Sequence, residues 1–219
     1  AKAGAQRLAA EYGLMLVAPD TSPRVRLPGD DSSWDFGVAA GFYVDATEAP
    51  WSAHYRMYSY VTRELPEFIA AQLANADTSR QSLTGHSMGG HGALVCALRN
   101  PGQYRSVSAF APIAAPMQCP WGRKAFTGYL GTDQTAWRQY DASELVLVQP
   151  FHSRILIDQG EADRFLPEQL HPQLFAAACA ASGQQLELRR HAGYDHGYYF
   201  IQTFMADHIA WHAAALGAA

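Results

Sequence analysis

A serine between two glycines is the residue of this chain whose type and setting point most clearly to chemistry. Residues 85–89 are Gly-His-Ser-Met-Gly, and Ser87 follows an expected strand and precedes a stretch typical of a helix. In a tight strand–turn–helix, the flanking glycines avoid side-chain clashes and the serine hydroxyl stands above the ends of the strands. The backbone N–H of Met88, at the start of the helix, can stabilise the oxyanion that forms when Ser87 attacks a carbonyl. The motif therefore predicts a nucleophilic serine.

A nucleophilic serine needs a general base, and the base needs an acid that orients it. In the α/β-hydrolase fold these residues follow the serine in the order acid, then histidine, each on a loop after a strand. Asp163 and His196 occur in such positions and are the predicted acid and base. Glu161 is the alternative acid on the same loop, and His191 is the alternative base.

The other histidines and Asp158 are expected to be structural. His86 and His91 flank the serine, where either could touch a substrate, although packing beneath the turn is the simpler interpretation. His208 and His212 are four residues apart on an expected helix, a spacing that can bind a metal. No third ligand or zincin glutamate accompanies them, so we expect surface residues and no metal site. Asp158, at a strand end, is expected to be a buried hydrogen-bonding group.

Apolar runs between turn residues predict strands, and helical spacing of apolar residues predicts helices. The expected strands are residues 14–19, 82–84, 106–111, 154–158 and 185–189, and the expected helices are residues 5–11, 58–73, 93–99, 168–182 and 199–216. Because strands and helices alternate, we expect an α/β fold, a mostly parallel sheet with helices on both faces. Residues 21–54 are expected to form a long ordered loop, and residues 112–150 an irregular segment.

Composition excludes several other classes of protein. The chain has 219 residues, of which 48% are hydrophobic and 16% charged, with a net charge of −4. This suits one folded domain and favours neither disorder nor nucleic-acid binding. No apolar run approaches the roughly 18 residues of a membrane span. Cys96, Cys119 and Cys179 form no CxxC pair, which favours a reducing, cytoplasmic location over a disulfide framework.

The chain begins with the first expected helix. In this fold the second oxyanion donor comes from a loop between the third strand and that helix. We therefore expect residues 1–219 to form a single α/β-hydrolase domain that lacks the initial strands and the oxyanion loop. A fragment of a longer protein is the favoured explanation, because exposed sheet edges promote association.

Several long stretches resemble the S-formylglutathione hydrolase family, also called esterase D. Residues 85–94, Gly-His-Ser-Met-Gly-Gly-His-Gly-Ala-Leu, carry the strongest resemblance. The other similar stretches are residues 18–24, 33–37, 41–47, 55–61, 119–122, 128–133 and 193–196. The resemblance runs from the first helix to the last, but the family's Ser-Gly-Leu-Thr-Cys loop, upstream of the first helix, has no counterpart.

The resemblance implies a cytosolic serine thioesterase that hydrolyses S-formylglutathione to glutathione and formate in formaldehyde detoxification. It also implies side activity on small esters, no cofactor, frequent homodimers, and a triad of Ser87, Asp163 and His196. The alternatives are a general carboxylesterase of the same fold and, for a naturally short chain, an inactive binding module. Substrate-binding candidates are His86, Trp121 and, for the glutathione carboxylates, Arg24, Arg56, Arg123 and Lys124; Cys119 is expected near the site.

Overall fold

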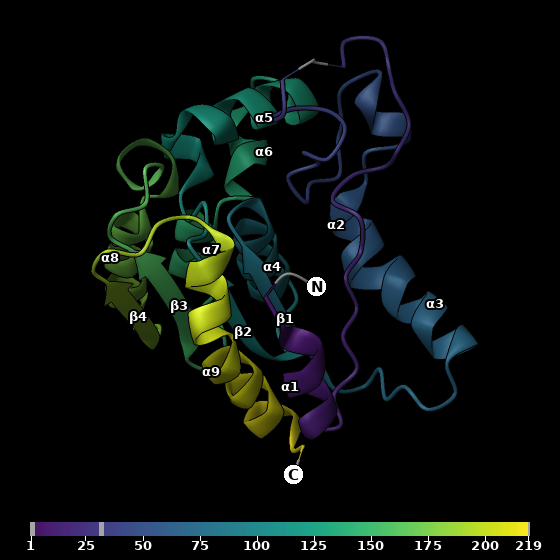
Figure 1. The fold of residues 1–219 in the computed structure, drawn as a ribbon. Helices are drawn as coiled ribbons and strands as arrows, with labels where there is room; N and C mark the ends of the chain where they lie inside the picture. Colours follow the sequence, from purple (N-terminus) through teal and green to yellow (C-terminus); the bar gives the residue numbers. More distant parts are fainter. Residues whose placement is uncertain (1–2, 31–32, 219) are drawn as a thin grey trace.

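Four parallel strands form the sheet of the computed structural model, which describes residues 3–30 and 33–218 (Figure 1). The strands lie in the order β1-β2-β3-β4, so each crossover moves one position along the sheet. Their bounds are β1 (Gln81–His86), β2 (Tyr104–Phe110), β3 (Ile155–Gly160) and β4 (Leu186–His191). The predicted parallel α/β architecture is confirmed.

Helices cover both faces of this sheet. On one face, α9 (Tyr198–Leu216) packs across β1, β2 and β3, and α1 (Ala5–Glu11) packs on α9 (Figure 1). On the other face lie α4 (Met88–Arg99), α7 (Ala142–Val148) and α8 (Pro172–Ser182). None of the described helices is both long and apolar enough to cross a membrane.

The side chains of strand β2 pack against helices on both faces of the sheet. Val107 and Ala109 belong to the apolar cluster with the residues of α4, whereas Phe110 packs edge-on against Phe200 of α9. Successive side chains of a strand point to opposite faces, so a strand covered on both sides is apolar on both. This explains why every residue of β3, and every residue of β2 except Arg105, is buried.

Residues 21–54 form the expected long loop, apart from residues 31–32, which lie outside the described residues. It contains the 3₁₀ helix η1 (Trp51–Ala53) and packs aromatic rings into the core. Tyr129 holds the loop by donating a hydrogen bond to Ala40 O and accepting one from Gly37 N–H. The predicted helical region that follows comprises α2 (Met57–Ser59), a π-helical turn η2 (Tyr60–Glu64) and α3 (Leu65–Gln72).

The prediction that residues 112–150 are irregular is wrong. The segment contains η3 (Pro116–Gln118), α5 (Pro120–Leu130), α6 (Gln134–Arg138) and α7. Pro116 and Pro120 stand at the first helical positions of η3 and α5, where a missing N–H is harmless. Side chains of Cys119, Asp133 and Asp141 cap the following helices. These residues therefore begin helices, although in sequence they resemble loop residues.

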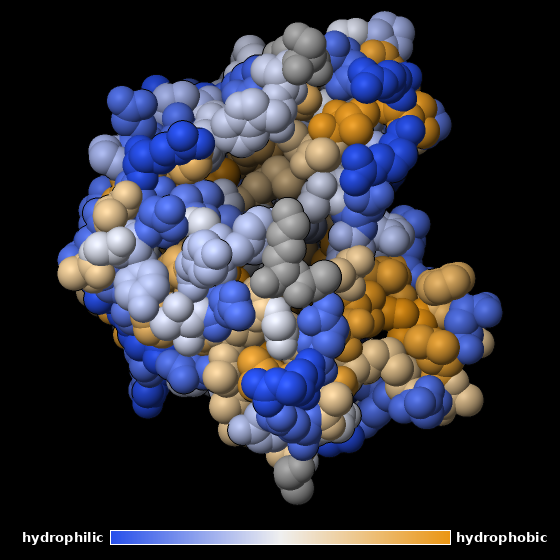
Figure 2. Space-filling model, viewed as in Figure 1, coloured by the Kyte–Doolittle hydropathy of each residue, from blue (hydrophilic) through white to orange (hydrophobic). Residues whose placement is uncertain are grey.

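The predicted strand at residues 14–19 is also wrong. Met15, Leu16 and Val17 are 45%, 44% and 46% exposed, and the segment pairs with no described strand. A strand exists only where a neighbour completes its hydrogen bonds. Figure 2 shows apolar side chains gathered over α3, which exposes Phe68 and is followed by the exposed Leu73.

One predicted helix is divided. Residues 168–182 were expected to be continuous, but the π-helical turn η4 (Leu166–Leu170) precedes α8. His171 separates them in a left-handed conformation, and Pro172 begins α8. Proline disfavours a helical conformation in the residue before it, so the break falls at His171.

Candidate active site

Ser87 occupies a strained turn between β1 and α4. Its backbone angles are φ 56° and ψ −117°, a region that residues with a side chain rarely adopt. Three hydrogen bonds hold it there: its N–H donates to Phe110 O at 2.9 Å, and its carbonyl accepts from His91 and Ile113 N–H at 3.0 and 3.2 Å. Strain of this kind persists where the surroundings over-determine it, and it concentrates at functional sites.

The glycines around Ser87 have different roles. A Cβ on Gly85 would lie 2.1 Å from Gly89 O, so this position cannot take a larger residue without moving the backbone. A Cβ on Gly89 would meet nothing closer than the Tyr43 hydroxyl, at 3.8 Å. Gly90 gives α4 its close contact with Pro112. Within the motif, packing therefore requires a glycine at position 85, whereas the space beside Gly89 is open.

Asp163 and His196 form a close pair. His196 Nδ1 donates to Asp163 Oδ2 at 2.5 Å, and the Asp163 side chain is fully buried. The other carboxylate oxygen, Oδ1, accepts from Phe165 N–H at 2.8 Å, and Gln159 Nε2 lies 3.4 Å from Oδ2. The carboxylate is therefore fixed in orientation, and it fixes the imidazole with the proton on Nδ1.

The two loops that carry this pair cross at Gly160. We call residues 161–165 the acid loop and residues 192–197 the base loop. A Cβ on Gly160 would lie 2.3 Å from Tyr194 O, so only glycine lets the loops meet. Backbone hydrogen bonds then join them, from Glu161 N–H to His191 O and from Ala162 N–H to Tyr194 O, both at 2.9 Å.

The alternative acid and base lie elsewhere. The Glu161 side chain is exposed, and His191 donates from Nε2 to Asp158 at 3.2 Å. Asp158 is fully buried and also accepts from Arg189 and His208, as a buried hydrogen-bonding group would. The geometry thus brings Asp163 and His196 together, whereas Glu161 is exposed and His191 is bonded to Asp158.

His196 lies beside the turn that carries Ser87. Its ring centroid is 4.3 Å from that of His86, the residue before Ser87. Burial lowers the pKa of His86 to about 4, which keeps this neighbour neutral. On another side the ring meets Phe165 edge-on at 5.0 Å, and Phe165 packs at 4.8 Å against Trp121 of α5. Phe165 escaped the sequence analysis because no motif marks it.

Three histidines outside the pair are buried. The prediction that His208 and His212 are surface residues is wrong, because they are 0% and 5% exposed. His212 bonds to Ser106 and Ser108 at 2.7 and 2.8 Å, so hydroxyl side chains on β2 satisfy it. His91 is also fully buried and donates from Nε2 to Phe42 O. In the described residues no three potential metal ligands gather.

These buried histidines predict loss of stability in acid. Burial lowers the pKa of His91 to about 4 and of His212 to about 3, against an ordinary value of 6.5. Below pH 6.5 the unfolded chain binds protons that the folded chain does not, so the free energy of unfolding decreases as pH falls toward those values. Each such histidine contributes a slope of about 1.4 kcal/mol per pH unit. Asp141, whose pKa burial raises to about 6, opposes the trend.

Urea denaturation of the protein and of His212→Asn at several pH values between 4.5 and 6.5 checks this. The slope of the unfolding free energy against pH should be smaller in the variant by the equivalent of about one proton. Asp141 contributes equally to both proteins, so its effect cancels in the comparison. The exposed His152→Asn is the matched control and should keep the original slope. An unchanged slope in His212→Asn would contradict the assignment.

The basic residues considered for glutathione all have partners. Arg24 pairs with Asp20, and Arg56 approaches Asp45. Arg123 donates to Met117 O, and Lys124 Nζ lies 2.7 Å from Asp35. Arg123 and Lys124 also line an open pocket of about 540 Å³ beside α5, together with Gly29, Phe36, Thr127 and Gly128. Cys119 is buried at the N-terminus of α5, where its Sγ accepts from Gly122 N–H.

Comparison with known proteins shows the family of this chain. The family model described as "Putative esterase" matches residues 1–211. The S-formylglutathione hydrolase of Mus musculus is 58% identical over 220 residues, 99% of this chain and 78% of the mouse protein. The chain belongs to the esterase family of the S-formylglutathione hydrolases.

Other members of this esterase family are equally similar in sequence and structure. The S-formylglutathione hydrolase of Arabidopsis thaliana is 54% identical over 98% of this chain and 76% of the plant protein. The solved structure of an S-formylglutathione hydrolase from Agrobacterium tumefaciens has a TM-score of 0.95 and 54% identity, covering 99% of this chain and 78% of that one. The parallel sheet and its helices are therefore those of an α/β-hydrolase.

Proposed function

We propose that this chain is a serine thioesterase that hydrolyses S-formylglutathione to glutathione and formate, with side activity on small esters. The observation that carries the proposal is the buried Asp163–His196 pair beside the strained turn of Ser87. The names of the close relatives, which are S-formylglutathione hydrolases, supply the substrate. Ser87 is the nucleophile, His196 the general base, Asp163 the orienting acid, and the Met88 N–H an oxyanion donor.

The reaction would proceed by two acyl transfers. His196 Nε2 takes the Ser87 proton as Ser87 Oγ attacks the thioester carbonyl, and Asp163 stabilises the resulting imidazolium. The Met88 N–H is at the first position of α4, has no acceptor within the helix and lies at the positive end of its dipole, which favours the oxyanion. The C–S bond then breaks and glutathione leaves with the proton from His196. A water molecule attacks the formyl-serine by the same route, releasing formate and restoring Ser87.

The surroundings of the pair suit a small acyl group and a peptide thiol. Phe165 stands against His196 with Trp121 behind it, and these rings limit the space beside the base. His86, neutral and adjacent to Ser87, is the polar side chain nearest to a bound acyl group in this proposal. The pocket lined by Arg123 and Lys124 lies on the helix that carries Trp121, and we assign it to the glutathione carboxylates.

The biological setting is proposed on the same basis. A formylglutathione thioesterase acts in formaldehyde detoxification, and we place it in the cytoplasm, where the free cysteines Cys96, Cys119 and Cys179 stay reduced. We further propose that residues 1–219 belong to a single domain and that the protein forms a homodimer. Neither nucleic acid, a membrane nor a cofactor takes part in the proposed reaction.

Substrate preference tests the proposed function. We expect kcat/KM for S-formylglutathione to exceed that for p-nitrophenyl acetate by about 100-fold or more, because only the thioester uses both the acyl site and the peptide contacts. Steady-state kinetics with both substrates on one preparation measures the ratio. S-acetylglutathione is the matched control for acyl size and should be cleaved more slowly than the formyl compound. A higher kcat/KM for the aryl acetate would instead identify a general carboxylesterase.

A further inference from the structure

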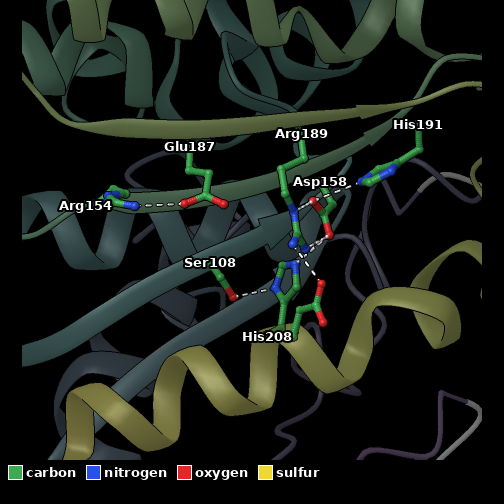
Figure 3. A network of polar contacts seen from close by, with 8 residues as sticks. Ser108, Arg154, Asp158, Glu187, Arg189, His191 and His208 are labelled. Carbon is green, nitrogen blue, oxygen red and sulfur yellow. Dashed lines mark hydrogen bonds and ion pairs between the residues drawn. The ribbon is translucent and has the colours of Figure 1, made fainter.

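A second aspartate–histidine pair, Asp158 and His191, joins β3 to β4 (Figure 3). Asp158, at the end of β3, accepts hydrogen bonds from Arg189 Nε and Nη2 at 2.5 Å, from His208 Nε2 at 3.1 Å and from His191 Nε2 at 3.2 Å. These partners come from β4 and α9. The fully buried Asp158 therefore joins three elements at the edge of the sheet where both loops begin.

The two pairs are arranged in parallel along the chain. Asp158 precedes Asp163 by five residues, and His191 precedes His196 by five. In both pairs the aspartate and the histidine are therefore the same number of residues apart in the sequence. The inner pair stands at the base of the acid loop and of the base loop. The backbone of His191 also contributes, since its carbonyl accepts from Glu161 N–H of the acid loop. A single residue thus contacts the strand β3 through its side chain and the acid loop through its backbone.

We infer that His191 is a positioning residue, whose hydrogen bond to Asp158 sets the distance and direction between Asp163 and His196. This inference rests on the proposed function for the roles of the outer pair. The His191 ring is held on two sides, by Asp158 and by stacking on Phe204 of α9 with centroids 3.8 Å apart. The base loop starts from this fixed ring and reaches His196 five residues later.

The charge of Asp158 does not require His191. Hydrogen bonds from His208, Arg189 and His191 hold the pKa of Asp158 well below its usual range against the effect of burial, and Arg189 forms a two-pronged ion pair with this carboxylate, so two of the three partners are still present without His191. Removing the His191 hydrogen bond therefore leaves no uncompensated buried charge, which is the usual cause of severe destabilisation. Phenylalanine at position 191 also keeps the ring stacked on Phe204. The His191→Phe variant is accordingly expected to fold.

Two substitutions separate positioning from packing. His191→Phe removes the N–H donor and keeps the ring, whereas His191→Gln keeps a donor near the place of Nε2 and removes the ring. We expect His191→Phe to lower kcat by about 10- to 100-fold, because small displacements of catalytic groups have effects of this size. KM should change by less than about twofold, since the substrate contacts are unaltered. His191→Gln should retain kcat within about threefold of the original.

Proton NMR gives a readout that does not depend on turnover. The short bond from His196 Nδ1 to Asp163 should give a far-downfield proton resonance, which we expect to shift or broaden in His191→Phe and to persist in His191→Gln. Glu187→Gln is the control, because Glu187 lies on β4, the strand that also carries His191. The substitution removes the ion pair between Glu187 and Arg154 (Figure 3) and should change neither the downfield resonance nor kcat.

The outcomes distinguish this inference from the proposed function. An unchanged resonance together with an unchanged kcat in His191→Phe would overturn the positioning role, as would equal losses in the Phe and Gln variants. Rates on p-nitrophenyl acetate are measured in parallel. If the wild-type protein cleaves this ester and not the thioester, the substrate assignment fails while the positioning role is still tested.

Discussion

We expect the Ser87→Ala variant to hydrolyse S-formylglutathione with a kcat lowered by about 10⁶-fold, the size of effect seen when a catalytic serine is removed. In the proposed mechanism the hydroxyl forms the acyl-enzyme, and no other side chain of the turn would replace it. The residual rate should reflect binding and oxyanion stabilisation alone. Alanine has no greater difficulty than serine with φ 56°, so the fold should persist. Single-turnover kinetics measures the effect.

Covalent labelling provides the control for this prediction. An organophosphonate should add one equivalent to the wild-type protein, and mass spectrometry should locate it on the peptide containing Ser87. Ser52→Ala, a serine on η1, is the matched control and should keep full activity and labelling. Labelling of Ser87→Ala at the same rate, or a kcat above a tenth of the original, would place the nucleophile elsewhere.

The Asp163→Asn variant is expected to lower kcat by about 10⁴-fold with little change in stability. Phe165 N–H donates to Oδ1 of residue 163, so an asparagine must place its amide oxygen there and its NH₂ toward His196. The amide then donates to His196 Nδ1, and the ring proton moves to Nε2. A histidine in this tautomer cannot accept the proton of Ser87. The loss thus comes from the direction of one hydrogen bond.

Glu161→Gln is the matched control, because it makes the same chemical change on the same loop at an exposed position. Its kcat should stay within about twofold of the original. Measurements of kcat and of thermal unfolding for both variants check the prediction. A large loss in Glu161→Gln, with Asp163→Asn near wild type, would reverse the assignment of the acid.

The buried centre of the fold was predictable because its signals are local. Apolar runs at residues 106–111 and 154–158 mark the buried strands β2 and β3, and the alternation of strands with helices then predicts a parallel sheet. The candidate site followed from the same logic. The carboxyl ends of parallel strands share one edge, so loops after β1, β3 and β4 were expected to meet. Asp163 and His196 do lie together there.

The errors have a common origin in tertiary context. Pro120 resembles a helix breaker until the capping residue before it is recognised, and residues 14–17 resemble a strand until the absence of a described partner is known. His208 and His212 resemble surface residues because nothing in their helix reveals the hydroxyl groups of Ser106 and Ser108 that receive them. A capping side chain, strand pairing and buried hydroxyl groups decide these three cases, and sequence periodicity encodes none of them.

The crossing of the two loops at Gly160 determines which distance in the site can vary. Backbone hydrogen bonds join the acid loop to the base loop, so a displacement of either carries the other with it. Asp163 and His196 then behave as one rigid body, while Ser87 belongs to a separate one, fixed by β2 and α4. A relative displacement of these two bodies would change the gap between His196 and Ser87 and leave the Asp163–His196 hydrogen bond unchanged.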